Sequence, residues 1–184
     1  MIKLFTPRLL LRDHRPEDLQ THHELFSNSG TMWYMQDIMT HNLEESRENL
    51  HQAIEQIDSS KRIYYFLRIE DRFTQAHIGE IGYTVTDFTP LGKIAGAGYF
   101  IRDEYWGKGY TSEAFRELIR FAFQDNNVYR ICCGCLKENK ASERVMQKCG
   151  LIKEADFKEY QWHDGKLKDR VEYRLLAHEW ADML

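Results

Sequence analysis

The stretch that decides the fold of this chain is Glu104-Tyr105-Trp106-Gly107-Lys108-Gly109-Tyr110-Thr111, which joins a predicted strand at Ala95–Ile101 to a predicted helix from about Thr111 to Gln124. Its two glycines let backbone N–H groups approach an anion closely, and the N-terminus of the following helix adds a partial positive charge. Lys108 can add a point charge. The stretch therefore predicts a phosphate-binding turn, although an ordinary tight connection is the alternative that these residues alone leave open.

Two better-known phosphate loops do not fit this stretch. A Walker loop requires Gly-Lys followed directly by Ser or Thr, whereas Lys108 is followed by Gly109. A dinucleotide-binding turn follows the first strand of a parallel βαβ unit and needs a third glycine, but position 112 is Ser112. The two strands before the turn, Ile78–Val85 and Ala95–Ile101, are joined by too few residues for a crossover helix, so we expect them to pair antiparallel.

The rest of the chain alternates strand and helix patterns. The expected elements are a strand at Leu9–Leu11, two helices within residues 19–57 after an acidic opening at 15–18, strands at 63–69 and 128–136, a helix at 140–148 ended by Gly150, and a hairpin of strands at about 155–163 and 168–176. This order predicts an α+β fold in which a mixed, mostly antiparallel central sheet is flanked by helices. A chain of 184 residues fits a single domain, 1–184.

Composition and charge narrow the class of protein. Hydrophobic residues make up 42% and charged residues 29% of the chain, as in an ordinary soluble globular protein. The formal charge of −4 argues against general nucleic-acid binding. No stretch approaches the roughly 20 apolar residues of a membrane span, and the N-terminus has no signal-peptide core. We therefore expect a cytoplasmic protein that binds neither nucleic acid nor membrane.

The four cysteines are expected to be reduced. Alternation along the strand at 128–136 places Cys132 on the opposite face from Cys133 and Cys135, which is poor geometry for a metal cluster. Cys149 has no neighbour at zinc-finger spacing. The sequence therefore predicts core thiols and no metal site.

A second pattern, about thirty residues after the glycine loop, changes the interpretation of that loop. It reads Asn139-Lys140-Ala141-Ser142-Glu143-Arg144-Val145-Met146-Gln147-Lys148-Cys149-Gly150-Leu151. Together the two stretches resemble the GNAT superfamily of N-acetyltransferases, and within it the branch of ribosomal-protein N-terminal (alanine) acetyltransferases. The resemblance runs nearly end to end, since it also covers residues 6–12 with Glu17-Asp18, residues 78–82, and residues 169–173 with Glu179-Trp180.

The resemblance implies that acetyl-CoA is the acyl donor. In such enzymes the backbone amides of the glycine loop hold the coenzyme A pyrophosphate, which maps onto Gly107, Lys108, Gly109, Tyr110 and Thr111. The strand before the loop, here Phe100, Ile101 and Arg102, splays from its neighbour and pairs with the pantetheine amides, and its backbone polarises the thioester carbonyl. Asn139 matches the asparagine that contacts the coenzyme arm.

Two departures from the superfamily pattern affect the chemistry. Glu104 stands where Gln or Arg usually opens the loop, so its side chain is a poor phosphate ligand. Met146 occupies the position of the tyrosine that acts as general acid toward the leaving thiolate. Ser142 lies one helical turn after Asn139 on the same face, so we predict it as the acid and as a contact to the coenzyme; a plain helix-surface serine is the alternative.

Acetyl transfer also needs a group that takes a proton from the amine. We predict Glu80 as this general base because it lies on the strand paired with the one before the loop; a solvent-facing strand residue is the alternative. Tyr173 reads as a second candidate in the site or as a core aromatic. Residues 33–35 lie in the segment that lines the acceptor site in relatives, where a substrate role and core packing both fit.

These features predict an acetyl-CoA-dependent N-acetyltransferase. Its acceptor is a primary amine, for which the α-amino group of a ribosomal or other protein is the first hypothesis. A small-molecule acceptor such as a polyamine, an amino acid or an aminoglycoside is the second. A catalytically idle coenzyme A sensor is the alternative of another class, because Met146 cannot donate a proton. The sequence leaves both a monomer and a homodimer open.

Overall fold

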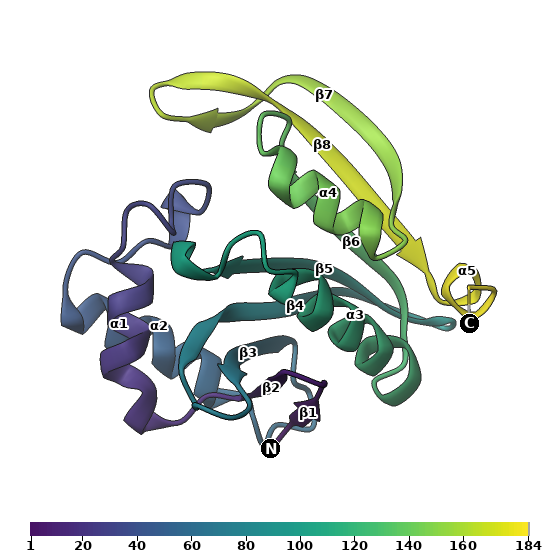
Figure 1. Ribbon diagram of the computed structural model, residues 1–184. Coiled ribbons are helices and arrows are strands. Elements are labelled where there is room, and N and C mark those ends of the chain that lie inside the picture. The colour runs from purple at the N-terminus through teal and green to yellow at the C-terminus, as the bar shows by residue number, and fades with distance from the viewer. Residues whose placement is uncertain (184) are drawn as a thin grey trace.

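The fold is built on one mixed sheet. The computed structural model describes residues 1–183, so residue 184 of the expected domain lies outside the described part. Eight strands pair in the order β1-β2-β3-β4-β5-β6-β8-β7, and every neighbouring pair is antiparallel except β5 and β6 (Figure 1). The strands are β1 (Lys3–Phe5), β2 (Leu9–Asp13), β3 (Tyr64–Asp71), β4 (His77–Thr89), β5 (Gly92–Ile101), β6 (Val128–Leu136), β7 (Ile152–His163) and β8 (Lys166–Leu176). The predicted mixed, mostly antiparallel sheet is confirmed.

Helices cover both faces of this sheet. They are α1 (Leu19–Phe26), α2 (Leu43–Glu55), α3 (Tyr110–Arg120), α4 (Lys140–Lys148) and α5 (Ala177–Ala181). Phe100 of β5 packs against Phe26 of α1, whereas the adjacent Tyr99 packs against Phe115 of α3. Since successive strand residues point to opposite faces, α1 and α3 lie on opposite sides of the sheet. No helix in the described residues 1–183 is long and apolar enough to cross a bilayer.

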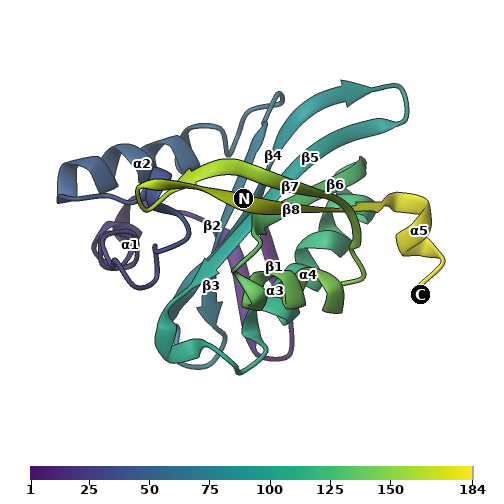
Figure 2. The same cartoon turned by 90° about the horizontal axis from the view of Figure 1, so that it is seen from above.

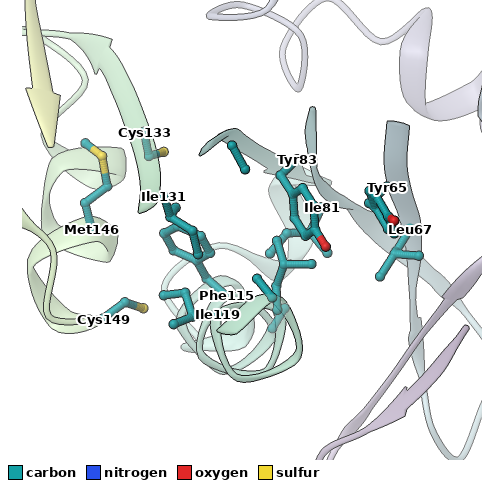
Figure 3. Close-up of a cluster of buried hydrophobic side chains, with 14 of the residues drawn as sticks. Tyr65, Leu67, Ile81, Tyr83, Phe115, Ile119, Ile131, Cys133, Met146 and Cys149 are labelled. Atoms are coloured by element: carbon teal, nitrogen blue, oxygen red, sulfur yellow. The ribbon is translucent and has the colours of Figure 1, made fainter. Parts of the chain in front are cut away.

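The main core lies between the sheet and α3. The apolar residues of α3 recur at helical spacing, and Phe115 and Leu118 are fully buried. In Figure 3 the rings and branched chains of α3 lie between Tyr83 on β4 and Ile131 on β6. Each such fully buried side chain contributes about 1.5–3 kcal/mol of hydrophobic free energy, so α3 is tightly fixed to the sheet.

The helix expected to run to Gln124 ends earlier as an α-helix. After α3, a π-helical turn occupies Phe121–Asp125. Arg120 donates hydrogen bonds to Glu117 and to Asp125, so the wider turn keeps this arginine paired on both sides. The bounds expected for β6 and α4 are confirmed, and Gly150 has the positive φ of a residue that ends a helix. Two short elements were not predicted, β1 and α5.

The functionally important irregularity is the separation of β5 from β6. The two strands pair from Lys93↔Val128 to Gly96↔Cys132 and then diverge. The β7–β8 hairpin continues the β6 side of the sheet and crosses above the α1–α2 segment, as the view from above shows (Figure 2). The diverging strands, α4 and this hairpin together surround the candidate site.

Candidate active site

A cleft of about 1190 Å³ opens where β5 and β6 diverge. Six parts of the chain line it: the segment between α1 and α2, the end of β5, the glycine loop with the start of α3, the end of β6, the exposed face of α4, and the β7–β8 hairpin. Most of the residues predicted to bind coenzyme A line this cleft, namely Phe100, Ile101, Gly107, Gly109, Tyr110, Thr111, Asn139 and Ser142. Arg102, Lys108 and Glu80 do not.

Beyond the point of divergence, β5 presents unpaired backbone groups to the cleft. The amide of Arg102 donates to the carbonyl of Ile78 on β4, and alternate residues of a strand direct their backbone groups to opposite neighbours. The backbone groups of Ala97, Tyr99 and Ile101 therefore point away from β4, toward the cleft. The Ile101 carbonyl already accepts a hydrogen bond from the Trp106 indole at 2.9 Å.

Of the three strand residues expected to pair with the coenzyme, Phe100 and Arg102 thus do not direct their backbone groups to the cleft. Arg102 is turned away from the cleft, because its guanidinium donates to the Thr21 carbonyl of α1 at 3.1 Å. Phe100 lines the cleft through its side chain, on the α1 face of the sheet. Only Ile101 of the three has its backbone on the cleft side, where Tyr99 and Ala97 join it.

The glycine loop has the conformation that an anion cradle needs. Gly107 and Gly109 have φ values of 73° and 80°, in the left-handed region that favours glycine, and Gly109 is the N-cap of α3. A methyl group added to Gly107 would meet no atom within 4 Å, so the space above it is open. The loop is held from behind by Arg8, whose guanidinium donates to the Lys108 carbonyl and pairs with Glu113.

The lysine of the loop does not supply the expected point charge in the cleft. The Lys108 ammonium donates to the Glu104 carbonyl at 2.7 Å. Three cations on α4 line the cleft instead, Lys140, Arg144 and Lys148. Their spacing of four residues places them on one face of the helix. This spacing is visible in the sequence, and it is the signal that could have identified the cationic face.

The start of α4 is fixed by its cap. The side-chain oxygen of Asn139 accepts a hydrogen bond from the Ser142 amide at 3.1 Å. The Ser142 hydroxyl lies 3.1 Å from the hydroxyl of Tyr99 on β5. Met146 is fully buried, with its side chain in the cluster of Cys133 and Cys149 (Figure 3). Burial raises the pKa of Cys149 to about 11, as expected of a core thiol.

Glu80 lies on β4 opposite Phe100, as predicted, but under α1 rather than in the cleft. It is buried, with its carboxylate 2.7 Å from His14 Nε2, 3.3 Å from His22 Nδ1 and 3.2 Å from His77 Nε2. Burial by itself would raise the pKa of Glu80, yet the charge of His14 and the three imidazole hydrogen bonds hold that pKa well below its ordinary value. A carboxylate so stabilised is a weak proton acceptor. Because Glu80 is buried, it is not a solvent-facing strand residue, and because it does not line the cleft, it has no direct contact with the cleft.

The same histidines define the charge of this polar cluster. Burial alone would lower the pKa of His14, but Glu80 and Asp18 raise it to about 9. His14, His22 and Glu80 are residues of the kind that bind metal ions, and their ligand atoms lie within 4.8 Å of one another. The 2.7 Å between His14 and Glu80 is a hydrogen-bond distance, shorter than the roughly 3.3 Å between neighbouring ligands of tetrahedral zinc. The geometry is that of an ionic hydrogen-bonded cluster.

The side of the cleft between the α1–α2 segment and the β7–β8 hairpin is bridged by aromatic side chains. Trp33 and Tyr34, from the segment between α1 and α2, both contact the ring of His163 at the tip of the β7–β8 hairpin, with centroids 5.1 and 5.9 Å apart. Residues 33–35 line the cleft, together with Asp37 on their side and Arg170 on β8. Tyr173 is a core residue whose hydroxyl donates to Glu143 of α4.

Comparison with known proteins identifies the family. Residues 8–152 match the model of the Acetyltransferase (GNAT) domain, and the chain belongs to this family. It is 28% identical over 181 residues to an uncharacterised N-acetyltransferase of Bacillus subtilis, covering 95% of this chain and 97% of that one. A ribosomal protein uS5-alanine N-acetyltransferase of Escherichia coli is 31% identical over 84 residues, which cover 46% of this chain and 43% of that one.

Solved structures show the same fold. The ribosomal-protein-S5-alanine acetyltransferase of Vibrio fischeri superposes with a TM-score of 0.84 at 21% identity, covering 98% of this chain and 99% of that one. Spermidine N-acetyltransferase of Vibrio cholerae, solved with CoA and spermine, has a TM-score of 0.81 at 20% identity, covering 96% and 99%. The protein described here is an acetyl-CoA-dependent N-acetyltransferase that transfers the acetyl group to an amine.

Proposed function

We propose that the acceptor is the α-amino group at the N-terminus of a protein. The observation that carries this proposal is the location of Glu80, which leaves the cleft without a buried base. Among the described residues, the carboxylates that line the cleft are Asp37 and Glu138, and both are exposed to water. An amine that is partly neutral near pH 7 needs little help in losing its proton. A protein α-amino group has a pKa of about 7.7–8.0, whereas a lysine-like amine has one of about 10.4.

The charges around the cleft support the same acceptor. A polyamine carries several ammonium groups, and its recognition calls for several carboxylates. The cleft instead offers few carboxylates: among the described residues Asp37 and Glu138 line it, and Glu138 is already paired with Lys168. Two of the cations that line it are likewise paired, Lys140 with Glu143 and Arg170 with Glu172. The aromatic bridge of Trp33, Tyr34 and His163 suits the extended end of a peptide with its first side chains. We place this reaction in the cytoplasm, in one domain.

We further propose how the donor is held. The amides of the loop from Gly107 to Thr111 bind the pyrophosphate at the start of α3. The cationic face of α4 binds phosphate oxygens as well, in the role first expected for the Lys108 side chain. The β5 edge at Ala97, Tyr99 and Ile101 pairs with the pantetheine amides beside Asn139, and Ser142 donates a hydrogen bond to the departing sulfur. Glu80 holds α1 through His22 and acts as a positioning residue.

The test is a thiol-release assay with acetyl-CoA against matched amines. The panel holds peptides with a free Ala or Ser N-terminus, the same peptides with a blocked N-terminus and one lysine, spermidine, and an aminoglycoside. We expect the free N-terminal peptides to have the highest kcat/KM. Their kcat/KM should rise with pH as the α-amine becomes neutral and level off above about pH 8.

The outcomes separate the alternatives. A higher kcat/KM for spermidine than for any free N-terminus would show that the acceptor is a polyamine, while the assignment as an N-acetyltransferase would stand. Turnover of the blocked lysine peptides with equal efficiency would contradict the pKa argument. Binding of acetyl-CoA without turnover of any amine would favour the idle sensor.

A further inference from the structure

We propose that Tyr99 and Ser142 form one hydrogen-bonding unit beside the departing sulfur: Tyr99 on β5 positions Ser142, and the Ser142 hydroxyl serves the leaving thiolate in place of the tyrosine that many family members carry at position 146 on α4. This inference rests on the proposed role of Ser142. It adds a residue that the sequence motifs do not mark, because Tyr99 lies in the strand rather than in either motif.

The geometry places both hydroxyl groups in the donor cleft. Tyr99 and Ser142 both line it, and Tyr99 follows directly after the point where β5 and β6 diverge. The Tyr99 hydroxyl lies 3.0 Å from the Ser142 carbonyl and 3.1 Å from the Ser142 hydroxyl. Its ring is fixed by Phe115 of α3, with ring centroids 5.0 Å apart. The two residues come from facing elements and meet on the α3–α4 side of the sheet.

Counting protons shows what this pair can do. The two hydroxyl groups carry two protons, and the Ser142 carbonyl can only accept. When the Tyr99 phenol donates to that carbonyl, the Ser142 proton is free to turn toward the cleft. Burial raises the pKa of Tyr99, so the phenol stays protonated and remains a donor throughout the working pH range. Tyr99 thus holds Ser142 through its backbone carbonyl and leaves the Ser142 hydroxyl one proton to offer.

The chemical step needs only a hydrogen bond from this unit. The amine nitrogen forms a bond to the acetyl carbon, the carbon–sulfur bond breaks, and its electron pair goes to sulfur. A thiol with a pKa near the 8.5 of cysteine leaves as a thiolate, which the Ser142 hydroxyl stabilises and which takes its proton from water. The proton of the amine goes to water as well. Removing one such donor typically lowers turnover by about 10²–10³-fold when it contacts the reacting oxyanion, so a donor to sulfur should have a smaller effect.

The alternative position for a tyrosine is closed. Met146 is fully buried in the main core, and the larger phenol would overpack this position. Overpacking of that kind costs about 1–3 kcal/mol. Tyr99 reaches α4 at Ser142, one helical turn before Met146, from the opposite element and without this cost.

The experiment is a double-mutant cycle of Tyr99→Phe and Ser142→Ala, with kcat and the acetyl-CoA KM measured on a turned-over amine. We expect each single variant to lower kcat by about 10-fold with KM changed less than 3-fold, and the double variant to be no slower than Ser142→Ala. Ser142→Thr keeps the hydroxyl and should recover most of kcat. Tyr83→Phe is the matched control, because Tyr83 is also a buried tyrosine with a hydrogen bond, to Asn126, and lies outside the cleft.

Three results would overturn the inference. They are an unchanged kcat in Tyr99→Phe, independent losses that multiply in the double variant, and an equal kcat loss in Tyr83→Phe, which would reveal a general effect of losing a buried hydroxyl. Failure of the wild-type protein to acetylate any amine would instead count against the proposed function. The two failures are therefore distinguishable within one set of assays.

Discussion

The Nε2 atom of His163 donates a hydrogen bond of 2.7 Å to the backbone carbonyl of Trp33, joining the tip of the β7–β8 hairpin to the segment between α1 and α2. These residues are 130 positions apart in the chain, and their rings also meet edge to face at 5.1 Å. This contact bridges the α1–α2 segment and the β7–β8 hairpin across the cleft. We propose that the acceptor enters between these two parts of the chain.

Removal of this bridge should loosen the acceptor site alone. A hydrogen bond and an edge-to-face ring pair are each worth about 0.5–1.5 kcal/mol, so His163→Ala should raise the acceptor KM by about 5–10-fold. The acetyl-CoA KM should stay within twofold. Steady-state kinetics with both substrates varied checks this prediction, with the exposed His51→Ala on α2 as control. Equal changes in both KM values would contradict it.

Glu80→Gln separates a positioning role from direct proton transfer. Loss of the carboxylate leaves His14 charged and buried without its closest partner, which typically costs about 3–5 kcal/mol of the free energy of unfolding. The folded variant should lose less than 10-fold in kcat/KM at pH 7, whereas loss of a true base costs about 10²–10⁴-fold. Urea unfolding and kinetics on the same preparation measure both. The exposed Glu44→Gln is the control and should change stability by less than about 0.5 kcal/mol.

The stability of the wild-type protein should fall on the alkaline side of neutrality. The folded pKa of His14, about 9, is above its ordinary value of 6.5, so its stabilisation is fully present below pH 6.5 and is lost as pH rises through 9. The difference corresponds to on the order of 3 kcal/mol. The groups facing His14 are Glu80, Asp18 and the ring of His22.

Urea unfolding from pH 6 to 10 measures this loss, and His14→Gln should flatten the curve between pH 7 and about 8. At higher pH the stability of both proteins should fall, because burial raises the pKa of the Cys133, Cys135 and Cys149 thiols. The lowered pKa values of Glu80 and His77 do not interfere, because they affect stability only on the acid side, below about 4.5 and 6.5 respectively. A wild-type curve that stays flat between pH 7 and 10 would contradict a charged His14.

Gly107→Ala tests whether the glycine loop binds the coenzyme, and Gly165→Ala, at a glycine of the same conformation, is its control. Gly107 and Gly165 have φ values of 73° and 76°, and a methyl group meets no atom within 4 Å at either. Both variants should therefore lose similar stability, about 1 kcal/mol. Coenzyme A at 100 times its Kd should raise the melting temperature of the wild type and of Gly165→Ala by about 5–10 °C, and that of Gly107→Ala much less. Equal shifts of the melting temperature in the two variants would show that the glycine loop is not part of the coenzyme A site.

The cationic face of α4 should govern affinity for the donor. Arg144→Gln combined with Lys148→Gln should raise the acetyl-CoA KM by about 10-fold and leave kcat within twofold, because these side chains bind phosphates remote from the reacting atoms. The increase should shrink as salt is added. Lys61→Gln, exposed beyond α2, is the control. A KM that does not change with either substitution would contradict phosphate binding by α4.

The sequence predicted well whatever depends on local pattern. Strand β6 and helix α4 have the expected bounds because strand alternation and the Asn139 cap are written in neighbouring residues. Glu80 was placed on the right strand, but its three histidine partners come from positions 14, 22 and 77. No local pattern shows that these side chains converge, and only their convergence decides whether the carboxylate is a base.

Tyr99 is a residue whose place in the site the sequence does not reveal. Its meeting with Ser142 depends on how far β5 and α4 are separated, which follows from the packing of both elements on α3. The orientation of Arg102 likewise depends on the position of α1, to which it is bonded. The family motifs identify the loop and the helix, and the packing decides which side chains face the cleft.

The divergence of β5 and β6 puts an unpaired strand edge inside a sheet rather than at its rim. Exposed edges at a rim attract strands of other chains and promote aggregation, and many proteins protect them with charges or bulges. The edge at residues 97–101 is instead walled in by α4 on one side and the hairpin on the other. The fold thereby keeps a surface suited to β-pairing while shielding it from self-association.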